Sequence, residues 1–172
     1  MRKILLCGYM GAGKTVVGRR LAQLTGFAFH DLDDCIEEDT AMRIGELFAV
    51  KGEIWFRKKE REVLTALLAS DKNEIIALGG GTPAYGNNHL LFEQPNVKAF
   101  YLQASIGELA ARLSQQRSHR PLIANIPEPE LEEFIGKHLF ERQLFYRHHT
   151  QIIQVDGKSP DEIGSEILTY LS

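Results

Sequence analysis

The apolar run Ile4–Cys7 leads directly into the segment 8–15, whose sequence is GYMGAGKT. After this segment, apolar residues recur at helical spacing at Val17, Leu21 and Leu24. A strand, a glycine loop ending in Lys-Thr and a helix form the context in which the pattern G-x-x-x-x-G-K-T binds phosphate groups. A plain strand-to-helix turn would account for the glycines, but not for a lysine and a threonine at the helix start. The segment therefore predicts a site for a nucleoside triphosphate.

The chemistry of such a loop is specific. Its glycines allow backbone N–H groups to turn towards an anion, and the start of the helix adds the positive end of the helix dipole. The lysine reaches the β- and γ-phosphates, and the threonine hydroxyl binds Mg²⁺. We therefore expect the nucleotide to contact Gly11, Ala12, Gly13, Lys14, Thr15 and Val16, with Thr15 also serving the metal.

Composition limits the other possibilities. The chain has 172 residues, 44% of them hydrophobic and 25% charged, which is typical of one compact domain with its own core. A formal net charge of −3 gives no indication of a nucleic-acid or membrane surface. Two cysteines are too few for a disulfide scaffold, and no apolar run could span a bilayer. We expect a single-domain, monomeric, cytoplasmic protein with small-molecule substrates.

The order of apolar runs predicts the fold class. Segments of helical period separate five short runs that are typical of buried parallel strands, and this alternation predicts an α/β three-layer sandwich, a five-stranded parallel sheet flanked by helices. The predicted strands are Ile4–Cys7, Phe27–Phe29, Ile75–Leu78, Ala99–Leu102 and Ile152–Val155.

Several helix ends are also predicted. Gly26 is expected to cap the first helix in a left-handed conformation, and residues 53–70 are expected to form a long helix. Segments 105–108 and 159–162 fit capping boxes, which place two more helix starts.

Residues 114–129 do not fit the sheet, because they are polar and interrupted by prolines. A loop of this length in a compact domain is usually functional, and in a nucleotide enzyme it is expected to be a mobile lid. Arg117 and Arg120 lie within it, which favours the lid over a tolerated surface insertion.

Carboxylates follow the second predicted strand, as Asp31, Asp33 and Asp34. Ligands of open α/β sheets bind at the carboxyl ends of the strands, so these acids are expected at the functional edge. An extended segment would point Asp31 and Asp33 to the same side, where one could serve Mg²⁺ and the other could accept a proton from an attacking hydroxyl. The alternative is helix capping, which we expect of Asp34 and not of the other two.

A glycine run and two arginines complete the candidate site. Gly79, Gly80 and Gly81 follow the third strand and permit close approach of a ligand, although a tight turn would need only one or two of them. Arginine suits carboxylate recognition, because its fork donates two parallel hydrogen bonds. Arg57 with Glu60, however, also fits an ordinary surface pair three residues apart.

Taken together, these motifs resemble those of the shikimate kinase family, small phosphate-loop kinases of the nucleoside-monophosphate-kinase type. The resemblance runs nearly end to end and is carried by the phosphate loop, residues 29–33 (FHDLD), residues 52–60 (GEIWFRKKE), the glycine run, residues 120–122 (RPL), Arg142 and Tyr146. The chain departs from many members at Leu32, where a serine or threonine is common, and at His30.

The resemblance implies a single kinase domain over residues 1–172 that uses ATP and Mg²⁺ and phosphorylates the 3-hydroxyl of shikimate in chorismate and aromatic amino acid biosynthesis. It implies that Asp33, Lys14 and Arg120 are catalytic, with Asp33 also binding the ring hydroxyls. The further residues that it implicates are Asp31 for Mg²⁺, Arg57 and Arg142 for the shikimate carboxylate, Glu60 for orienting Arg57, Gly79, Gly80 and Gly81 for the ring, and Lys158, Ser159 and Pro160 for the adenine.

Two alternatives remain at this point. A gluconate or nucleotide kinase of similar fold could use the same arginines, since gluconate also carries a carboxylate. A nucleotide-dependent switch protein would need an Asn-Lys-x-Asp and an Asp-x-x-Gly motif. The first is absent from the sequence, and the second occurs only at residues 161–164, where the capping box places the start of a helix.

Overall fold

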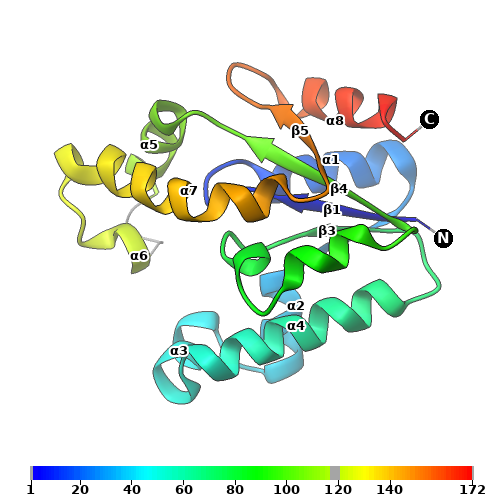
Figure 1. Ribbon diagram of the computed structural model, residues 1–172, viewed down its shortest axis with the longest axis horizontal. Coiled ribbons are helices and arrows are strands. Elements are labelled where there is room, and N and C mark those ends of the chain that lie inside the picture. Colours follow the sequence, from blue (N-terminus) through cyan, green and yellow to red (C-terminus); the bar gives the residue numbers. More distant parts are fainter. Residues whose placement is uncertain (1, 117–120, 172) are drawn as a thin grey trace.

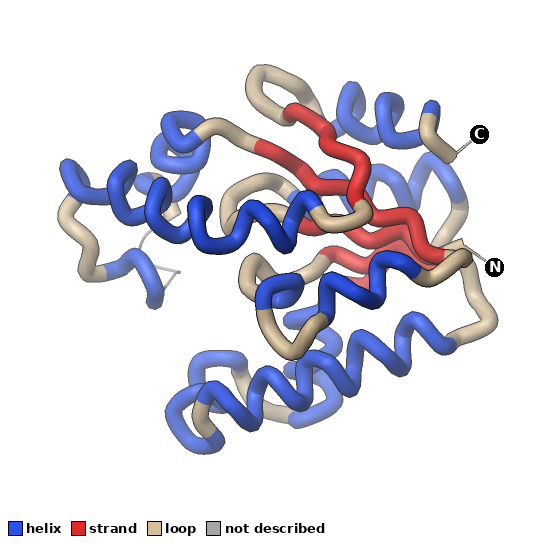
Figure 2. Tube along the Cα trace, in the orientation of Figure 1, coloured by secondary structure: helices blue, strands red, loops and turns tan. Residues whose placement is uncertain are grey.

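The computed structural model describes residues 2–116 and 121–171. Five parallel strands form one sheet in the order β2-β3-β1-β4-β5. Helices lie on both sides of this sheet (Figures 1 and 2), which confirms the predicted three-layer α/β fold. The strands are β1 (Lys3–Cys7), β2 (Ala28–Asp31), β3 (Glu74–Ala77), β4 (Val97–Gln103) and β5 (Thr150–Gln154).

The helices divide into two layers and a lobe. On one face of the sheet α1 (Lys14–Thr25) packs beside α8 (Pro160–Thr169), and on the other lie α7 (Leu131–Arg147) and the 3-10 helix η2 (Asn88–Glu93) (Figure 1). Next to the edge strand β2, a lobe is formed by α2 (Leu32–Thr40), α3 (Ile44–Lys51) and α4 (Glu53–Ala69). The remaining elements are η1 (Thr82–Ala84), α5 (Ile106–Ser114), α6 (Pro121–Ala124) and η4 (Glu128–Glu130). In the described part of the chain, no helix has the length and apolar character needed to cross a bilayer.

The expectation that all five strands are buried is right for the centre of the sheet and wrong for its edges. Every residue of β1 and β3 is buried. In β2 no residue is fully buried, and in β5 only Ile153 is. Central strands are covered by neighbours on both sides, whereas an edge strand has a neighbour on one side only.

A buried ion pair joins the starts of the two central strands. Lys3 and Glu74 stand opposite each other in the β1–β3 register, and Lys3 Nζ lies 2.5 Å from Glu74 Oε2. Ser70 Oγ accepts from Lys3 Nζ at 2.6 Å and donates to Glu74 Oε2 at 2.7 Å. The predicted strands begin one residue later, at Ile4 and Ile75, so this pair lay outside the predicted sheet.

The predicted helix ends are largely confirmed. Gly26 has a φ of 73° and donates its N–H to the carbonyl of Ala22, as a left-handed C-cap does. Ser159 forms a complete capping box with Glu162. Ser105 caps α5 through its side chain, but its N–H donates to Asp156, so the reciprocal half of that box is not formed.

The described part of the lid region contains helical segments. Within the predicted segment 114–129, α6 and the start of η4 are helical. Arg117 and Arg120 lie outside the described residues, so their predicted roles stay predictions.

Gly18 lies where α1 packs closely against neighbouring side chains, so replacing it should change the stability. In α1, a Cβ on Gly18 would overlap the ring of Phe29 and lie 3.3 Å from Leu6 Cδ1. Alanine normally favours a helix, but at this position the overlap should outweigh that gain, and we expect Gly18→Ala to lower the free energy of unfolding by about 1–3 kcal/mol. Urea denaturation measures the change. Gly107→Ala is the control, because its Cβ would meet nothing within 4 Å; an undiminished stability in Gly18→Ala would show that Phe29 moves aside without cost.

Candidate functional site

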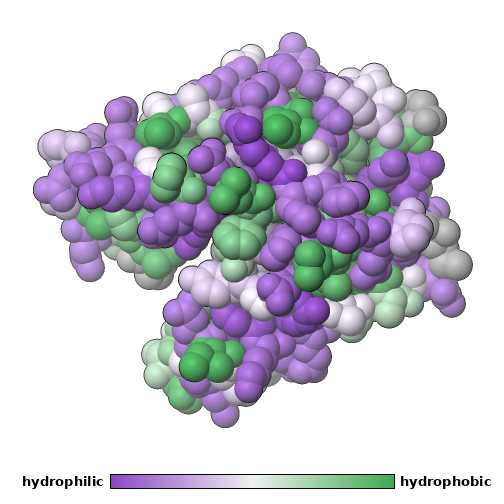
Figure 3. All heavy atoms as spheres, in the orientation of Figure 1, coloured by the Kyte–Doolittle hydropathy of each residue, from purple (hydrophilic) through white to green (hydrophobic). Residues whose placement is uncertain are grey.

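A cavity of about 510 Å³ opens at the carboxyl ends of β1, β2 and β3. Its walls also include residues from α3, α4, α6 and α7, and the space-filling view is hollowed between the part that carries α7 and the lobe of α3 and α4 (Figure 3). The predicted site residues that line it are Gly11, Gly13, Lys14, Thr15, Val16, Asp31, Asp33, Arg57, Gly79, Gly80, Gly81 and Arg142.

The backbone conformation of the phosphate loop is suited to binding an anion. Gly11 and Gly13 have φ values of 83° and 93°, a region that residues with a Cβ rarely adopt. Gly13 is the N-cap of α1 and has no side chain to cap it, so the first amide groups of the helix face an incoming ligand. Lys14 Nζ donates to the carbonyl oxygens of Gly8 at 2.8 Å and Tyr9 at 3.0 Å, which holds the ammonium at the loop.

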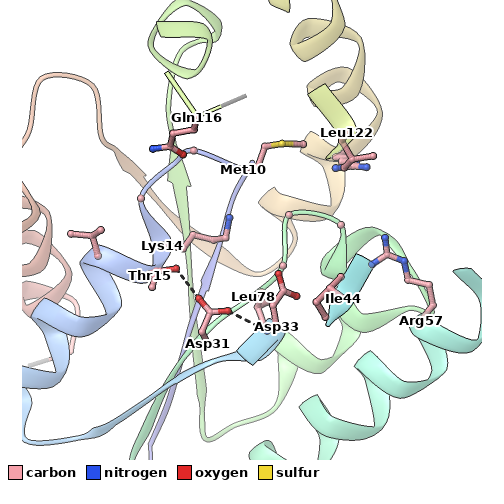
Figure 4. A pocket seen from close by; sticks show the side chains of 17 residues that line it. Met10, Lys14, Thr15, Asp31, Asp33, Ile44, Arg57, Leu78, Gln116 and Leu122 are labelled. Atoms are coloured by element: carbon pink, nitrogen blue, oxygen red, sulfur yellow. Dashed lines mark hydrogen bonds between the residues drawn. The ribbon is translucent and has the colours of Figure 1, made fainter. Parts of the chain in front are cut away.

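Thr15 and Asp31 meet beside this loop. Thr15 Oγ1 donates to Asp31 Oδ2 at 2.7 Å, and Asp31 Oδ1 accepts from the backbone N–H of Asp33 at 3.2 Å (Figure 4). A hydroxyl and a carboxylate oxygen are the hard ligands that Mg²⁺ takes alongside phosphates. Among the described residues there is no group of three or more His, Cys, Asp or Glu side chains that could hold a metal by themselves.

The capping prediction for this segment is wrong. Asp31 is the N-cap of α2, and Asp34, predicted as the cap, lies in the first turn of the helix instead. Asp33 is likewise helical, so the extended geometry that was to align Asp31 with Asp33 does not occur. Both still reach the cavity, because β2 ends at Asp31 and the helix begins immediately after it.

The carboxyl of Asp33 has an unusual environment. Burial raises the pKa of its carboxyl to about 6, and the negative charges of Asp31 and Glu60 act in the same direction, whereas Lys14 and Arg57 oppose them. A carboxyl with this pKa is ionised at neutral pH, yet binds a proton more strongly than an ordinary aspartate. Perturbed carboxyls of this kind in a cavity are typical of functional sites.

Arg57 is held by a buried carboxylate. Arg57 Nη1 donates to Glu60 Oε2 at 2.9 Å, while the other Glu60 oxygen accepts from Thr82 Oγ1 at 2.7 Å. Glu60 is 1% exposed, so it is a support behind Arg57 and not part of the cavity wall. This arrangement excludes the ordinary surface pair as an account of Arg57 and Glu60.

The glycine run has a steric explanation. None of Gly79, Gly80 and Gly81 has a positive φ, so an unusual turn does not require them. A Cβ on Gly79 would stand 2.9 Å from Thr82 Oγ1 and 3.2 Å from Asp33 Oδ1. The run is therefore needed because other groups pack closely against its backbone.

The other two glycines touch both sides of the site. A Cβ on Gly80 would stand 3.3 Å from the amide nitrogen of Met10 in the phosphate loop. A Cβ on Gly81 would stand 2.9 Å from Arg57 Nη2. The run thus leaves room for the phosphate loop on one side and for the guanidinium on the other.

The helix α7 brings Arg142 to the cavity and is tied to both loops. One turn before Arg142, His138 Nδ1 lies 3.1 Å from the hydroxyl of Tyr9; one turn after it, the Tyr146 hydroxyl donates to the carbonyl oxygen of Gly80. Burial lowers the pKa of His138, and the charge of Arg142 adds to this shift. A neutral His138 can accept the Tyr9 hydroxyl at Nδ1.

Some predicted residues lie elsewhere. Ala12, within the phosphate loop, is buried and does not line the cavity. Lys158 pairs with Glu166 at 2.6 Å, Ser159 caps α8 and Pro160 is the first residue of that helix, and none of these three lines the cavity. Their contact with adenine stays a prediction. His30, one of the two departures from the family pattern, contacts Glu74 away from the cavity.

The structure adds residues to which the sequence analysis assigned no role. Arg112 Nη1 donates to the carbonyl of Gly11 at 3.1 Å, which brings another guanidinium to the phosphate loop. Arg112 also pairs with Glu108 one helical turn away, and this spacing alone indicates an ordinary ion pair on a helix. The cavity is also lined by Met10, Ile44, Leu78, Gln116 and Leu122. Four of these five residues are apolar and carry no signal that separates a ligand wall from a core, and the polar Gln116 lies in the predicted lid segment.

The raised pKa of Asp33 can be measured directly by titration. We expect its carboxyl to titrate at about pH 6 in carbon-detected NMR, and at a lower pH in Asp31→Asn, because a negative neighbour is removed. An asparagine oxygen can still accept the Asp33 N–H, so the helix cap is retained. Asp34→Asn is the matched control and should leave the Asp33 titration unchanged. An Asp33 that titrates near the ordinary value of about 4 would contradict the assignment.

Comparisons with known proteins agree with this geometry. The family model described as "Shikimate kinase" matches residues 10–172. The chain is 48% identical to a shikimate kinase of Flavobacterium johnsoniae over 172 residues, 100% of both chains.

Solved structures give the same result. A crystal structure of shikimate kinase from Bacteroides thetaiotaomicron has a TM-score of 0.88 and 32% identity, covering 99% of this chain and 97% of that one. A shikimate kinase from Acinetobacter baumannii in complex with shikimate has a TM-score of 0.86 and 30% identity, with coverages of 99% and 93%. A gluconokinase from Sinorhizobium meliloti, at 16% identity and a TM-score of 0.64, shares the fold alone. Since the family model spans nearly the whole chain and a full-length relative is 48% identical, the chain belongs to the shikimate kinase family.

Proposed function

We propose that this protein transfers the γ-phosphoryl group of ATP to the 3-hydroxyl of shikimate and releases shikimate 3-phosphate and ADP. The observation that carries the proposal is one cavity with a phosphate loop on one wall and Asp33, Arg57 and Arg142 on the other. In Figure 4, Lys14 and Arg57 lie on opposite sides of the pocket, with Asp33 between them. This arrangement provides for a triphosphate and a carboxylated alcohol in the same space.

On the nucleotide side, the amide groups at the start of α1 and the Lys14 ammonium bind the β- and γ-phosphates of ATP. The hydroxyl of Thr15 fits as a direct ligand of Mg²⁺, and the carboxylate of Asp31 fits as a ligand through water, since the two oxygens are adjacent on the cavity wall. The ion neutralises phosphate charge as it develops. Arg120, in the lid 114–129, is proposed to reach the phosphates when the lid closes.

On the acceptor side, Arg57 and Arg142 bind the shikimate carboxylate through charge-assisted hydrogen bonds. Glu60 holds Arg57 in place, and the backbone of residues 79–81 contacts the ring side of the substrate. Asp33 accepts the proton of the 3-hydroxyl as the oxygen attacks the γ-phosphorus. Positioning and charge neutralisation supply most of the catalysis in such transfers.

The proposal also covers the adenine site and the oligomeric state. Residues 158–160 are proposed to border the adenine, at the loop that leads from β5 into α8. The protein is proposed to act in the cytoplasm as a monomer, with both substrates bound by one chain.

The acceptor is tested by following ADP release in a coupled assay with ATP and one acceptor at a time. Turnover is expected with shikimate, and not with gluconate or nucleoside monophosphates, because the chain belongs to the shikimate kinase family and shares only the fold with a gluconokinase. Chelation of Mg²⁺ should abolish the turnover with shikimate. Turnover with gluconate, and none with shikimate, would contradict the proposed function but not the assignment of the fold.

The base is tested by Asp33→Asn. Loss of a general base typically costs a factor of about 10²–10⁴, and we expect kcat to fall by this amount while the Kd for ATP, measured by calorimetry, stays unchanged. In the wild type, kcat/KM should fall below about pH 6, where the Asp33 carboxyl becomes protonated and can no longer accept a proton. The neighbouring Asp34→Asn is the control. Full activity in Asp33→Asn would exclude Asp33 as the base.

A further inference from the structure

The guanidinium of Arg57 lies against an aromatic ring from another part of the chain. Its central carbon is 4.0 Å from the centroid of the Tyr85 ring, and more distant faces are offered by Phe56 at 5.2 Å and Phe48 at 6.0 Å. Phe56 and Phe48 belong to the α3–α4 lobe, whereas Tyr85 follows η1 on the far side of the glycine run. A cation this close to a ring face is attracted by the ring's negative face.

Tyr85 and Glu60 restrain different degrees of freedom of the same group. The hydrogen bond from Nη1 to Glu60 Oε2, at 2.9 Å, holds one edge of the guanidinium. That single bond still allows the guanidinium to rotate about the bonded edge. The ring of Tyr85, whose face lies against the guanidinium carbon, opposes this rotation. Glu53 does not replace either restraint, because its Oε1 is 3.7 Å from Nε and the contact is no hydrogen bond.

The segment that carries Tyr85 is itself fixed to the helix of Arg57. The backbone carbonyl of Tyr85 accepts from the Asn88 N–H at 3.0 Å, and the Asn88 side-chain amide donates to the Thr82 carbonyl at 3.0 Å. Arg61, one turn after Arg57 on α4, donates from Nη1 to Asn88 Oδ1 at 3.1 Å. Thr82 and Asn88 are fully buried, so the ring is presented from a firmly held loop.

We propose that Tyr85 is a positioning residue that keeps the Arg57 guanidinium in the plane that receives the acceptor carboxylate. The inference rests on the proposed function, because it needs Arg57 to bind that carboxylate. If the guanidinium occupies this plane only part of the time, its affinity for the carboxylate falls in proportion to that fraction of time. Tyr85 therefore acts on acceptor affinity through Arg57, without touching the reacting atoms.

The first test replaces the ring. Tyr85→Leu should raise the KM for shikimate by roughly 2- to 30-fold, the range that a cation–π contact supports, and leave kcat and the KM for ATP unchanged. Tyr85→Phe keeps the ring face and should keep the wild-type KM. Tyr170→Leu is the matched control, since Tyr170 is an exposed tyrosine whose ring meets Phe100 in a tilted contact and, among the described residues, faces no guanidinium.

The second test keeps the shape and changes only the electrostatics. Phenylalanine analogues with one, two and three ring fluorines at position 85 weaken the negative face stepwise, and the KM for shikimate should rise with each fluorine. A role limited to filling space would not follow this series. The series also serves if Tyr85→Leu fails to fold.

A double-mutant cycle identifies the residue through which Tyr85 acts. Arg57→Ala should itself raise the KM for shikimate, and Tyr85→Leu should add nothing further in that background. Additive effects, or an unchanged KM in both Tyr85→Leu and the fluorine series, would overturn the inference. Failure of the proposed function is a different result, because the wild type would then not phosphorylate shikimate at all.

Discussion

Both halves of the site depend on a direct contact between the backbones of two loops. Gly80 lies against the phosphate loop, where a Cβ would stand 3.3 Å from the Met10 amide nitrogen. The loops follow neighbouring strands, and the Leu78 N–H still donates to the Leu6 carbonyl at 2.9 Å just before they separate. Because two backbones pack directly, the phosphate-binding wall and the acceptor wall face each other within one cavity. Transfer between two bound groups requires this proximity.

The helix α7 contacts both loops, through His138 and Tyr146. Arg142 lies between these two contacts on the same helix.

The site concentrates like charges, and this has a cost in stability. Asp31, Asp33 and Glu60 lie close enough that the pKa of Asp33 rises to about 6, chiefly through burial and then through its two acidic neighbours. Because this folded-state pKa lies above the ordinary value of about 4, the folding free energy that Asp33 contributes is lost as pH rises from about 4 to about 6, and the cost persists at neutral pH. The same shift makes Asp33 a better proton acceptor at neutral pH. The buried pair of Lys3 and Glu74 differs, since Ser70 completes its hydrogen bonds and it takes no part in the cavity.

Much of the fold could be predicted because its signals are local. The phosphate loop, the left-handed cap at Gly26 and the capping box at Ser159 each depend on residues a few positions apart. The alternation of apolar runs and helical periods predicted a parallel sheet with helices on both faces. The burial of the edge strands and the capping residue of α2 were predicted wrongly. Burial of a strand depends on its neighbours in the sheet, and which of several adjacent aspartates caps a helix depends on where the strand before it ends.

For the site, the sequence alone determined the chemical groups: an anion-binding loop with Lys14 and Thr15, acids after the second strand, a glycine run and arginines suited to a carboxylate. Each follows from the residue types within a short stretch, whatever the rest of the chain does. Only the tertiary structure decided how these groups act on one another, including the raised pKa of Asp33, the stacking of Tyr85 on Arg57 and the approach of Arg112 to the phosphate loop. These pairings join residues far apart in the chain, and each residue type alone is equally compatible with an exposed surface.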